Sequence, residues 1–292
     1  MVTNKNRKIK PIIIAIIIIL IYSWGCSSIS VEKSPNLPQN LEYLKSLTLN
    51  YSPAKIIYNN FSDSYLCLDE NNNTVYIYDN KFKLIQKIEQ NSGINQFSNL
   101  SDVSFDSAGN LYVLDSDFNK IFKFDDEGQY ISNINLIQTK EPKLIKIKNN
   151  GDFLIYDEFS NEIYCLSYNN KVRYTFGKFE LIEPSNLCAT LNLNYVLDVG
   201  TNKILVFDNF GSLIKTIVPI NKILSLTTSK YFFFYLDSDS NIFIGKKTYQ
   251  LKKTISKLSN YNSIKKPQNI FITKTGIGII EINKVHLLQF SN

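Results

Sequence analysis

Few residues in this chain of 292 could carry reaction chemistry. The sequence contains one histidine, His286, and four cysteines, Cys26, Cys67, Cys165 and Cys188. No two cysteines have the close spacing of a metal site or of a redox pair. The histidine is far from every cysteine in sequence. The chain also lacks a Gly-x-Ser-x-Gly elbow and a glycine-rich phosphate loop. We therefore predict no catalytic residue, no metal site and no cofactor site.

Cys26 follows the most specific short stretch of the chain. A basic run at positions 5–10 precedes an apolar run at 12–22. The apolar run has 11 residues, whereas a helix needs about 20 to cross a bilayer. This layout predicts an export signal peptide over residues 1–25 rather than a stable transmembrane helix.

The sequence Ser23-Trp24-Gly25-Cys26 resembles the lipobox of bacterial lipoproteins. This resemblance implies that diacylglycerol is attached to the Cys26 thiol, that cleavage makes Cys26 the mature N-terminus, and that the lipid anchors the protein outside the cytoplasm. Gly25 fits the pattern, whereas Ser23 stands where Leu is usual and Trp24 is unusually bulky. An uncleaved membrane anchor is the alternative. Ser27 resembles the outer-membrane sorting signal of some bacteria, which favours the outer over the inner membrane.

The charge of the mature body argues against nucleic acid as a partner. Residues 1–25 hold four of the 32 Lys and Arg and none of the 26 Asp and Glu, so the remainder has a net charge of +2. No basic cluster lies outside the signal. Residues 26–41 are rich in Ser, Pro and Asn, and we expect them to form a flexible tether.

The body contains three cysteines, each within an apolar run. An odd number cannot all pair with one another, so we expect Cys67, Cys165 and Cys188 to be buried, unpaired thiols. We expect His286 to be a partly exposed strand residue rather than a catalytic base.

A repeat of about 40 residues determines the expected fold. Its marks are an acid after an apolar run, an Asn four residues later and an aliphatic or aromatic residue two further. The acids are Asp69, Asp115, Asp157, Asp198, Asp237 and Glu281, at spacings of 46, 42, 41, 39 and 44, and the matching Asn residues are Asn73, Asn119, Asn161, Asn202, Asn241 and, only two positions after its acid, Asn283. We expect these acids and Asn residues to cap hairpins. We expect the aromatic residues that follow to pack between repeats.

Each repeat predicts four short strands. In the clearest copy these are 103–106, 111–115, 120–125 and 130–134, separated by turns rich in Asn, Asp and Gly. Four antiparallel strands per 40 residues are typical of a β-propeller blade. The sequences LYVLDSDFNKIFKFDDEG (111–128) and YVLDVGTNKILVFDNFG (195–211) resemble the NHL-repeat class of propellers. The resemblance implies a propeller and leaves its function open.

The expected fold is therefore all-β: a six-bladed β-propeller of four-stranded antiparallel blades over residues 42–292. The last repeat ends one strand short, while Leu47, Leu49 and Tyr51 alternate with polar residues ahead of the first repeat. We predict that this N-terminal segment completes the last blade and closes the ring.

The expected innermost strands differ in composition from those of propeller enzymes. Lactonases and lyases of this shape typically hold a metal in the central channel with acidic, Asn and His groups. The expected inner strands are 56–60, 103–106, 144–148, 187–191, 224–228 and 269–273. Asp106 is the one carboxylate within them, and Asp102 lies just before its strand. Calcium takes about six to eight oxygen ligands, which this set does not supply.

These observations favour a non-enzymatic lipoprotein of the cell envelope that acts as a binding or scaffold module for a protein partner. A propeller enzyme of the lactonase or lyase type is one alternative. A sensor of glycans or small molecules is another.

Overall fold

The computed structural model describes residues 36–90, 96–246 and 251–291. The expected signal peptide, Cys26 and most of the expected tether lie outside the described residues. Leu37–Asn292 form one compact unit. Among the described residues, no helix is both long enough and apolar enough to cross a membrane.

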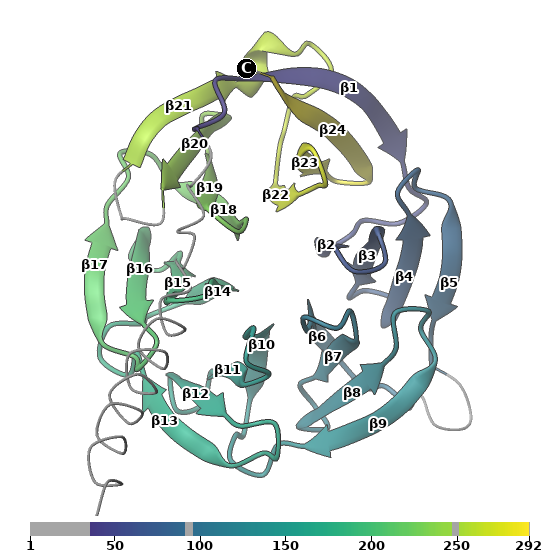
Figure 1. Ribbon diagram of the computed structural model, residues 1–292, viewed down its shortest axis with the longest axis vertical. Coiled ribbons are helices and arrows are strands. Elements are labelled where there is room, and N and C mark those ends of the chain that lie inside the picture. The colour runs from purple at the N-terminus through teal and green to yellow at the C-terminus, as the bar shows by residue number, and fades with distance from the viewer. Residues whose placement is uncertain (1–35, 91–95, 247–250, 292) are drawn as a thin grey trace, which may run out of the picture. The chain divides into compact units, whose positions relative to one another are not determined.

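The unit is a ring of six four-stranded antiparallel sheets (Figure 1). Blade 1 holds β2 (Lys55–Asn59), β3 (Ser64–Asp69), β4 (Thr74–Asp79) and β5 (Leu84–Ile88); blade 2 holds β6 (Leu100–Phe105), β7 (Leu111–Asp115), β8 (Lys120–Phe124) and β9 (Tyr130–Asn135); blade 3 holds β10 (Pro142–Ile147), β11 (Phe153–Asp157), β12 (Glu162–Leu166) and β13 (Val172–Phe176); blade 4 holds β14 (Pro184–Ala189), β15 (Leu193–Asp198), β16 (Lys203–Asp208) and β17 (Leu213–Ile217); blade 5 holds β18 (Ile223–Thr228), β19 (Phe232–Asp237), β20 (Asn241–Lys246) and β21 (Leu251–Lys257); blade 6 holds β22 (Asn269–Ile272), β23 (Gly276–Glu281), β24 (Lys284–Ser291) and β1 (Asn40–Thr48). The predicted six-bladed β-propeller is confirmed.

The N-terminal strand closes the ring, as predicted. β1 pairs antiparallel with β24 from Asn40 opposite Ser291 to Thr48 opposite Lys284, and it forms the outer strand of blade 6. The two ends of the described chain therefore share one sheet, which joins the last blade to the segment leading into the first.

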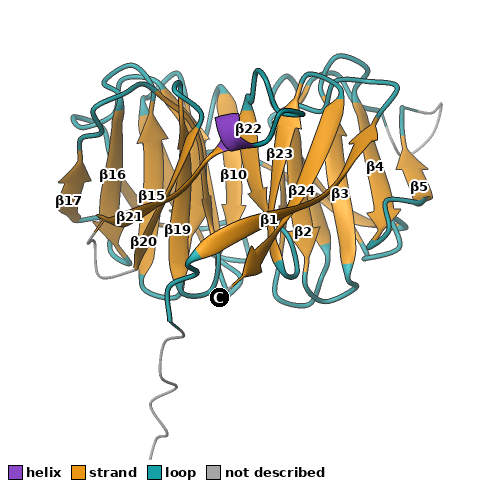
Figure 2. Cartoon of the chain, turned by 90° about the horizontal axis from the view of Figure 1, so that it is seen from above, coloured by secondary structure: helices purple, strands orange, loops and turns teal. Residues whose placement is uncertain are grey.

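The ring has two distinct faces. One face, here called the crossover face, carries the hairpins between the second and third strands of each blade and the connections from one blade to the next. The short 3-10 helix Leu258–Asn260 belongs to the connection between blades 5 and 6 and marks the upper, crossover face in Figure 2. The opposite face carries the remaining hairpins and the end of β24.

The blades are held together by apolar side chains packed between neighbouring sheets. The second strands β3, β7, β11, β15 and β19 are buried at every position, because both of their faces are covered by adjacent blades. Of the aromatic residues expected between blades, Tyr78, Phe122, Phe124 and Phe207 are buried, and Tyr76 and Tyr164 are half-buried.

The cysteine prediction is right for two residues and wrong for the third. Cys67 and Cys165 are buried and unpaired, and burial raises the pKa of the Cys67 thiol to about 12. Cys188 is unpaired but only half-buried. It lies on the inner strand β14, where one edge of the sheet borders the central channel instead of another strand.

Asp69, Asp115, Asp157, Asp198 and Asp237 cap their hairpins, as predicted. The prediction is wrong for Glu281, which accepts the N–H groups of Lys265 and Lys266 in the connection that enters blade 6. Three of the capping acids also hold the connection that enters their own blade. The Asp115 carboxylate accepts the N–H of Phe118 (3.0 Å) within its own hairpin and the N–H groups of Ser98 (2.7 Å) and Asn99 (3.3 Å) in the incoming connection. The same pattern recurs at Asp157 and Asp198. Asp115, Asp157 and Asp198 therefore each fix two separate pieces of backbone.

The repeated Asn residues join each blade to the next. Asn73, Asn119, Asn161 and Asn202 adopt φ values between 45° and 54°, a left-handed conformation that Asn tolerates better than most residues. Their Nδ2 atoms donate to carbonyl oxygens of the following connection, at Ser98 (3.0 Å), Lys140 (3.1 Å), Leu181 (2.8 Å) and Asn221 (3.1 Å) respectively.

Blades 5 and 6 depart from this pattern. In blade 5, Ser240 rather than Asn241 takes the left-handed position (φ 62°), and the backbone and side-chain N–H groups of Asn241 donate to Asp237 instead. In blade 6 the shortened hairpin places Ile282 at φ 52°. Asn283 nevertheless donates to the carbonyl oxygen of Leu49 (3.2 Å), in the connection that enters blade 1. The prediction that the Asn side chains cap their own hairpins is therefore wrong for Asn73, Asn119, Asn161 and Asn202, whose side chains bond the connection to the next blade.

The hydrogen bonds that join Asn202 to the following connection are here called a clasp. We predict that two substitutions of Asn202 separate the stability contributed by this clasp from the stability that depends on the left-handed backbone conformation. Asn202→Gly removes hydrogen bonds to Asn221 and from Ile223, at about 0.5–1.5 kcal/mol each. Asn202→Ala additionally places a Cβ in the left-handed region, at about 1–2 kcal/mol. Urea unfolding should therefore order the stabilities as native, then Gly, then Ala. A Gly variant as stable as the native chain would contradict the clasp.

Candidate functional site: the central channel

The six inner strands surround a central channel (Figure 1). The observed strands β2, β6, β10, β14, β18 and β22 correspond to the six predicted inner strands, with boundaries differing by a few residues. All six contribute to the lining of a hollow of about 120 Å³ inside the ring. A second hollow, of about 240 Å³, adjoins the opposite face and is lined by hairpin residues such as Asn60 and Ser107.

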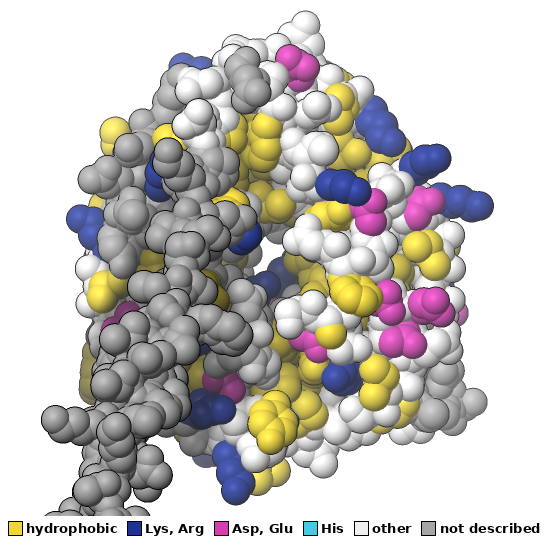
Figure 3. Space-filling model, viewed as in Figure 1, with side chains coloured by type: hydrophobic (Ala, Val, Ile, Leu, Met, Phe, Trp, Pro, Cys, Tyr) yellow, Lys and Arg dark blue, Asp and Glu magenta, His cyan; other side chains and the backbone are white. Residues whose placement is uncertain are grey.

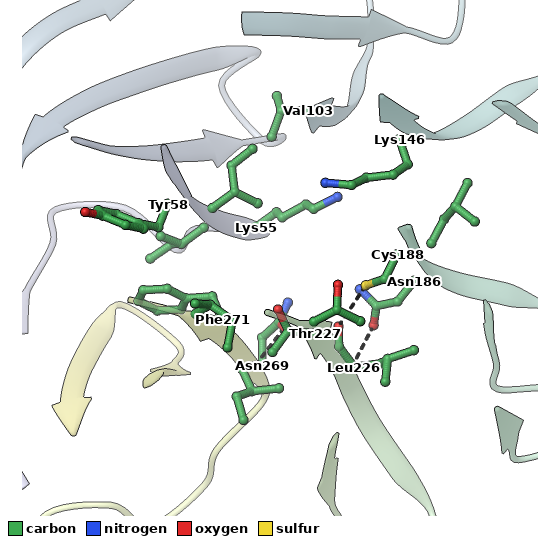
Figure 4. A pocket seen from close by; sticks show the side chains of 16 residues that line it. Lys55, Tyr58, Val103, Lys146, Asn186, Cys188, Leu226, Thr227, Asn269 and Phe271 are labelled. Atoms are coloured by element: carbon green, nitrogen blue, oxygen red, sulfur yellow. Dashed lines mark hydrogen bonds between the residues drawn. The ribbon is translucent and has the colours of Figure 1, made fainter. Parts of the chain in front are cut away.

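Two lysines dominate the charge of the channel. Lys55 starts β2 and Lys146 lies on β10, and both line the first hollow. Basic side chains are visible at the centre of the ring in Figure 3. In Figure 4 the amino ends of Lys55 and Lys146 point into the same space from different blades. Lys146 also lines the second hollow, so it stands where the two meet.

Lys55 is neutralised by a buried carboxylate. Its Nζ lies 2.6 Å from Asp102 Oδ1. The Asp102 carboxylate also accepts the N–H of Val103 (2.7 Å) and, across the blade boundary, the N–H of Ile145 (2.9 Å). Asp102 therefore links blades 1, 2 and 3 at the channel wall.

The structure corrects the placement of the two acids near the inner strand of blade 2. Asp102 lies within β6, which begins at Leu100, because the strand extends further toward the crossover face than its apolar run indicated. Asp106 follows the end of the strand and caps the next turn. It accepts the N–H groups of Ala108 and Asn110, both at 2.9 Å. Asp102, not Asp106, is thus the inner-strand carboxylate.

Several other polar side chains of the inner strands accept hydrogen bonds from backbone N–H groups at the strand edge that has no partner strand. The innermost strand of a blade has one edge without a partner strand, and its N–H groups need acceptors. The bonds run from Ile147 N to Ser104 Oγ (3.0 Å), from Leu226 N to Asn186 Oδ1 (3.3 Å) and from Ile270 N to Asn269 Oδ1 (2.8 Å). Two of these three bonds also connect neighbouring blades.

Lys146 differs from these groups because no hydrogen bond or ion pair engages its ammonium among the described residues. Burial lowers its pKa, and the nearby ammonium of Lys55 adds to this effect, while Cys188 and Asp102 oppose it. Burial raises the pKa of the Cys188 thiol. The thiol therefore stays protonated at neutral pH, and its Sγ donates to the carbonyl oxygen of Leu226 at 3.7 Å.

His286 lies away from the channel and is buried, so the expectation of partial exposure is wrong. It stands on β24, next to the outer strand of blade 6, and is 1% exposed. The closing strand β1 covers it, and Tyr43 Oη of that strand lies 3.2 Å from its Nδ1. On the other side of the imidazole ring, Glu281 Oε2 at the end of β23 lies 3.2 Å from its Nε2. Across residues 36–90, 96–246 and 251–291, no group of three or more His, Cys, Asp or Glu side chains could hold a metal ion.

The fold defines the class of protein, a six-bladed β-propeller. A family model described as "6-bladed beta-propeller" matches residues 45–140. A comparison with curated proteins found no match.

Several solved structures share the architecture. A streptogramin B lyase superposes with a TM-score of 0.60 at 11% identity, covering 88% of this chain and 100% of that one. Virginiamycin B lyase from Staphylococcus aureus gives 0.59 at 12%, covering 86% and 100%. The β-propeller domain of Myceliophteria thermophila Cps50 (Swd1) gives 0.60 at 8%, covering 86% and 100%. At these identities the likeness shows the fold alone.

We predict that the Lys55–Asp102 pair is a strong structural contact. Asp102→Asn leaves the Lys55 ammonium unpaired next to a carboxamide in the channel wall, and this should lower the free energy of unfolding by about 3–5 kcal/mol. Lys55→Met combined with Asp102→Asn should recover part of that loss because no unpaired charge remains. Thermal and urea unfolding measure the stability of the single variant and of the double variant.

The matched control is Glu158→Gln, which breaks the ion pair between Glu158 and Lys143 on the surface (3.4 Å). Because both of these side chains are exposed, we expect a change within about 0.5 kcal/mol. Equal effects of the two single substitutions would contradict a special role for Asp102.

Proposed function

We propose that the protein is a lipid-anchored lipoprotein of the cell envelope whose NHL-like propeller is a non-enzymatic binding or scaffold module for a protein partner. The observation that carries the proposal is the set of large apolar side chains exposed on the crossover face.

This set, here called the crossover patch, extends over the hairpins and connections of blades 2 to 5. Its members are between 48% and 102% exposed and comprise Phe118, Ile137, Phe159, Phe179, Ile182, Val218 and Ile220. The hairpins and connections of the opposite face carry four such residues in the described chain, namely Phe61, Tyr168, Leu191 and Phe210. The crossover face of blades 2 to 5 thus presents more large apolar side chains to water than the hairpins of the opposite face do, and such side chains favour contact with another protein.

The chemistry of the channel also supports binding rather than catalysis. The Asp102 carboxylate is saturated by Lys55 and two backbone N–H groups. The Cys188 thiol is held in its protonated form. Neither group is therefore available as a nucleophile or as a general base at neutral pH.

The anchor in this proposal is Cys26, on the basis of its lipobox-like surroundings and the preceding apolar run. Ser27 favours the outer membrane over the inner one. A tether between Cys26 and the propeller would hold the crossover patch near other envelope proteins without fixing its orientation.

We predict that Cys26→Ser abolishes the incorporation of labelled fatty acid into the full-length chain, because it removes the thiol that would accept diacylglycerol. Cys188→Ser, which keeps that thiol, should leave labelling unchanged. Labelled Cys26→Ser protein would contradict lipidation at this site. Loss of label from Cys26→Ser with full membrane retention would identify the uncleaved apolar segment as a second anchor.

We predict that the full-length protein, cross-linked in membranes, recovers one protein partner in stoichiometric amount. Phe179→Asp should weaken the isolated complex at least tenfold, because buried aromatic residues dominate interface energies. Phe210→Asp is the matched control, since these two phenylalanines are similarly exposed, at 90% and 81%, on different faces. Recovery of no stoichiometric partner, or equal weakening by the two variants, would overturn the proposal.

A further inference from the structure

The central channel contains a cation without a counterion, and this feature plays no part in binding at the crossover patch. Within the channel, Lys55 is paired with Asp102 at 2.6 Å. Lys146 lines both hollows and has no hydrogen-bond or ion-pair partner in the described part of the chain. Because Lys55 and Asp102 balance each other, Lys146 is the channel ammonium that lacks a partner among the described residues.

The backbone alternation of β10 places this cation in the channel. Ile145 and Ile147 are buried in the apolar core between blades 2 and 3, at 0% and 4% exposure. Lys146 stands between them and extends to the other side, where Figure 4 shows its amino end in the hollow. A lysine at this position does not contribute to the packing of the blades.

The channel supplies few internal acceptors that could neutralise Lys146. The Oδ1 atoms of Asn186 and Asn269 already accept backbone N–H groups. The Cys188 thiol donates to a carbonyl oxygen. The carboxylate of Asp106, at the second hollow, accepts two backbone N–H groups, Asn110 Nδ2 (2.8 Å) and Tyr112 Oη (3.1 Å). A desolvated ammonium without a partner favours the entry of an anion.

We propose that the channel binds a small monocarboxylate, whose carboxylate pairs with the Lys146 ammonium while its short apolar body contacts the half-buried side chains of Ile57 and Ile272. One unpaired positive charge matches one negative charge. A dianion such as phosphate would exceed the charge of this one ammonium, and the Asp106 carboxylate at the second hollow would repel it further. The apolar lining residues favour an organic acid over a bare inorganic ion.

Calorimetric titration of the full-length protein in non-ionic detergent tests the proposal, with butyrate as the probe because it is too short to partition strongly into micelles. We expect one saturable site that prefers butyrate to phosphate and to chloride, and no binding of butylamine. Lys146→Met should weaken butyrate binding at least tenfold. Lys143→Met is the matched control: it removes the same charge from the same strand but at the surface, where Lys143 pairs with Glu158, and it should leave the affinity unchanged.

The pH dependence provides a second readout. The ammonium form binds the carboxylate, so affinity is constant at low pH and falls as pH rises through the pKa of Lys146. Because burial and Lys55 lower that pKa against the opposing effects of Cys188 and Asp102, the fall should begin below the pH at which an ordinary lysine loses its proton. Circular dichroism serves to check that Lys146→Met is folded. Lys146→Gln, a polar but uncharged alternative, should weaken butyrate binding to the same extent.

Three outcomes would overturn the proposal. The first is the absence of saturable butyrate binding at millimolar concentrations. The second is tighter binding of phosphate or chloride than of butyrate, which would make the channel an inorganic anion site. The third is equal weakening by Lys146→Met and Lys143→Met. None of these outcomes bears on the protein partner, because Phe179 and the crossover patch lie outside the channel.

Discussion

The connection that leads from one blade into the next is held from both sides by hydrogen bonds, and the ring depends on this arrangement. At Ser98 the carbonyl oxygen accepts from Asn73 of blade 1, while the N–H donates to Asp115 of blade 2. At Lys140 the same two backbone groups bond to Asn119 of blade 2 and Asp157 of blade 3. A blade is a small sheet that buries its faces only against neighbours. A polar clasp at the junctions between blades 1 and 2, 2 and 3, and 3 and 4 fixes the distance and rotation at which those apolar faces meet.

The channel shows the complementary problem at the inner edge of the sheets. Six strand edges without a partner strand converge there, and their N–H groups are satisfied by side chains such as Ser104, Asn186 and Asn269. Asp102 performs this role twice and needs Lys55 to balance its charge. Most polar residues of the channel are thus accounted for by backbone satisfaction. Lys146 stands apart from them because it neither caps backbone nor balances a buried acid.

The sequence was sufficient to predict the fold because the ring repeats its local physics. The acid and Asn positions mark a turn that needs a capped hairpin and a left-handed residue, and both requirements can be recognised without knowing what lies opposite. The alternation of Leu47, Leu49 and Tyr51 likewise predicted a closing strand from this segment, although the strand runs over Asn40–Thr48 and ends before Leu49 and Tyr51. The failures are also informative. Asn241 was assigned to the repeat from its spacing alone. The hairpin before it has one residue fewer between its strands than that of blade 2, so Ser240 takes the left-handed position.

The channel could be predicted only in outline, because its chemistry depends on contacts between blades. Nothing local to Lys55 indicates that it meets Asp102, 47 residues later. Lys146 lies in an alternating run, Leu144 to Lys148, that suits a half-exposed strand on any surface. The expected inner strand 144–148 contains Lys146, whereas Lys55 lies one residue before the expected strand 56–60. Neither position reveals that one of the two lysines is paired and the other is not.

The crossover face carries two sets of residues with separate roles. The clasp residues Asp115, Asp157 and Asp198 are at most 1% exposed and serve the ring. Their neighbours Phe159, Phe179 and Ile220 are 60%, 90% and 102% exposed, so their side chains stabilise the fold little. Exposed apolar residues on such well-fixed loops are therefore not explained by folding. A rigid frame that presents apolar side chains lowers the entropy lost on association, which is the physical reason for placing the proposed partner on this face.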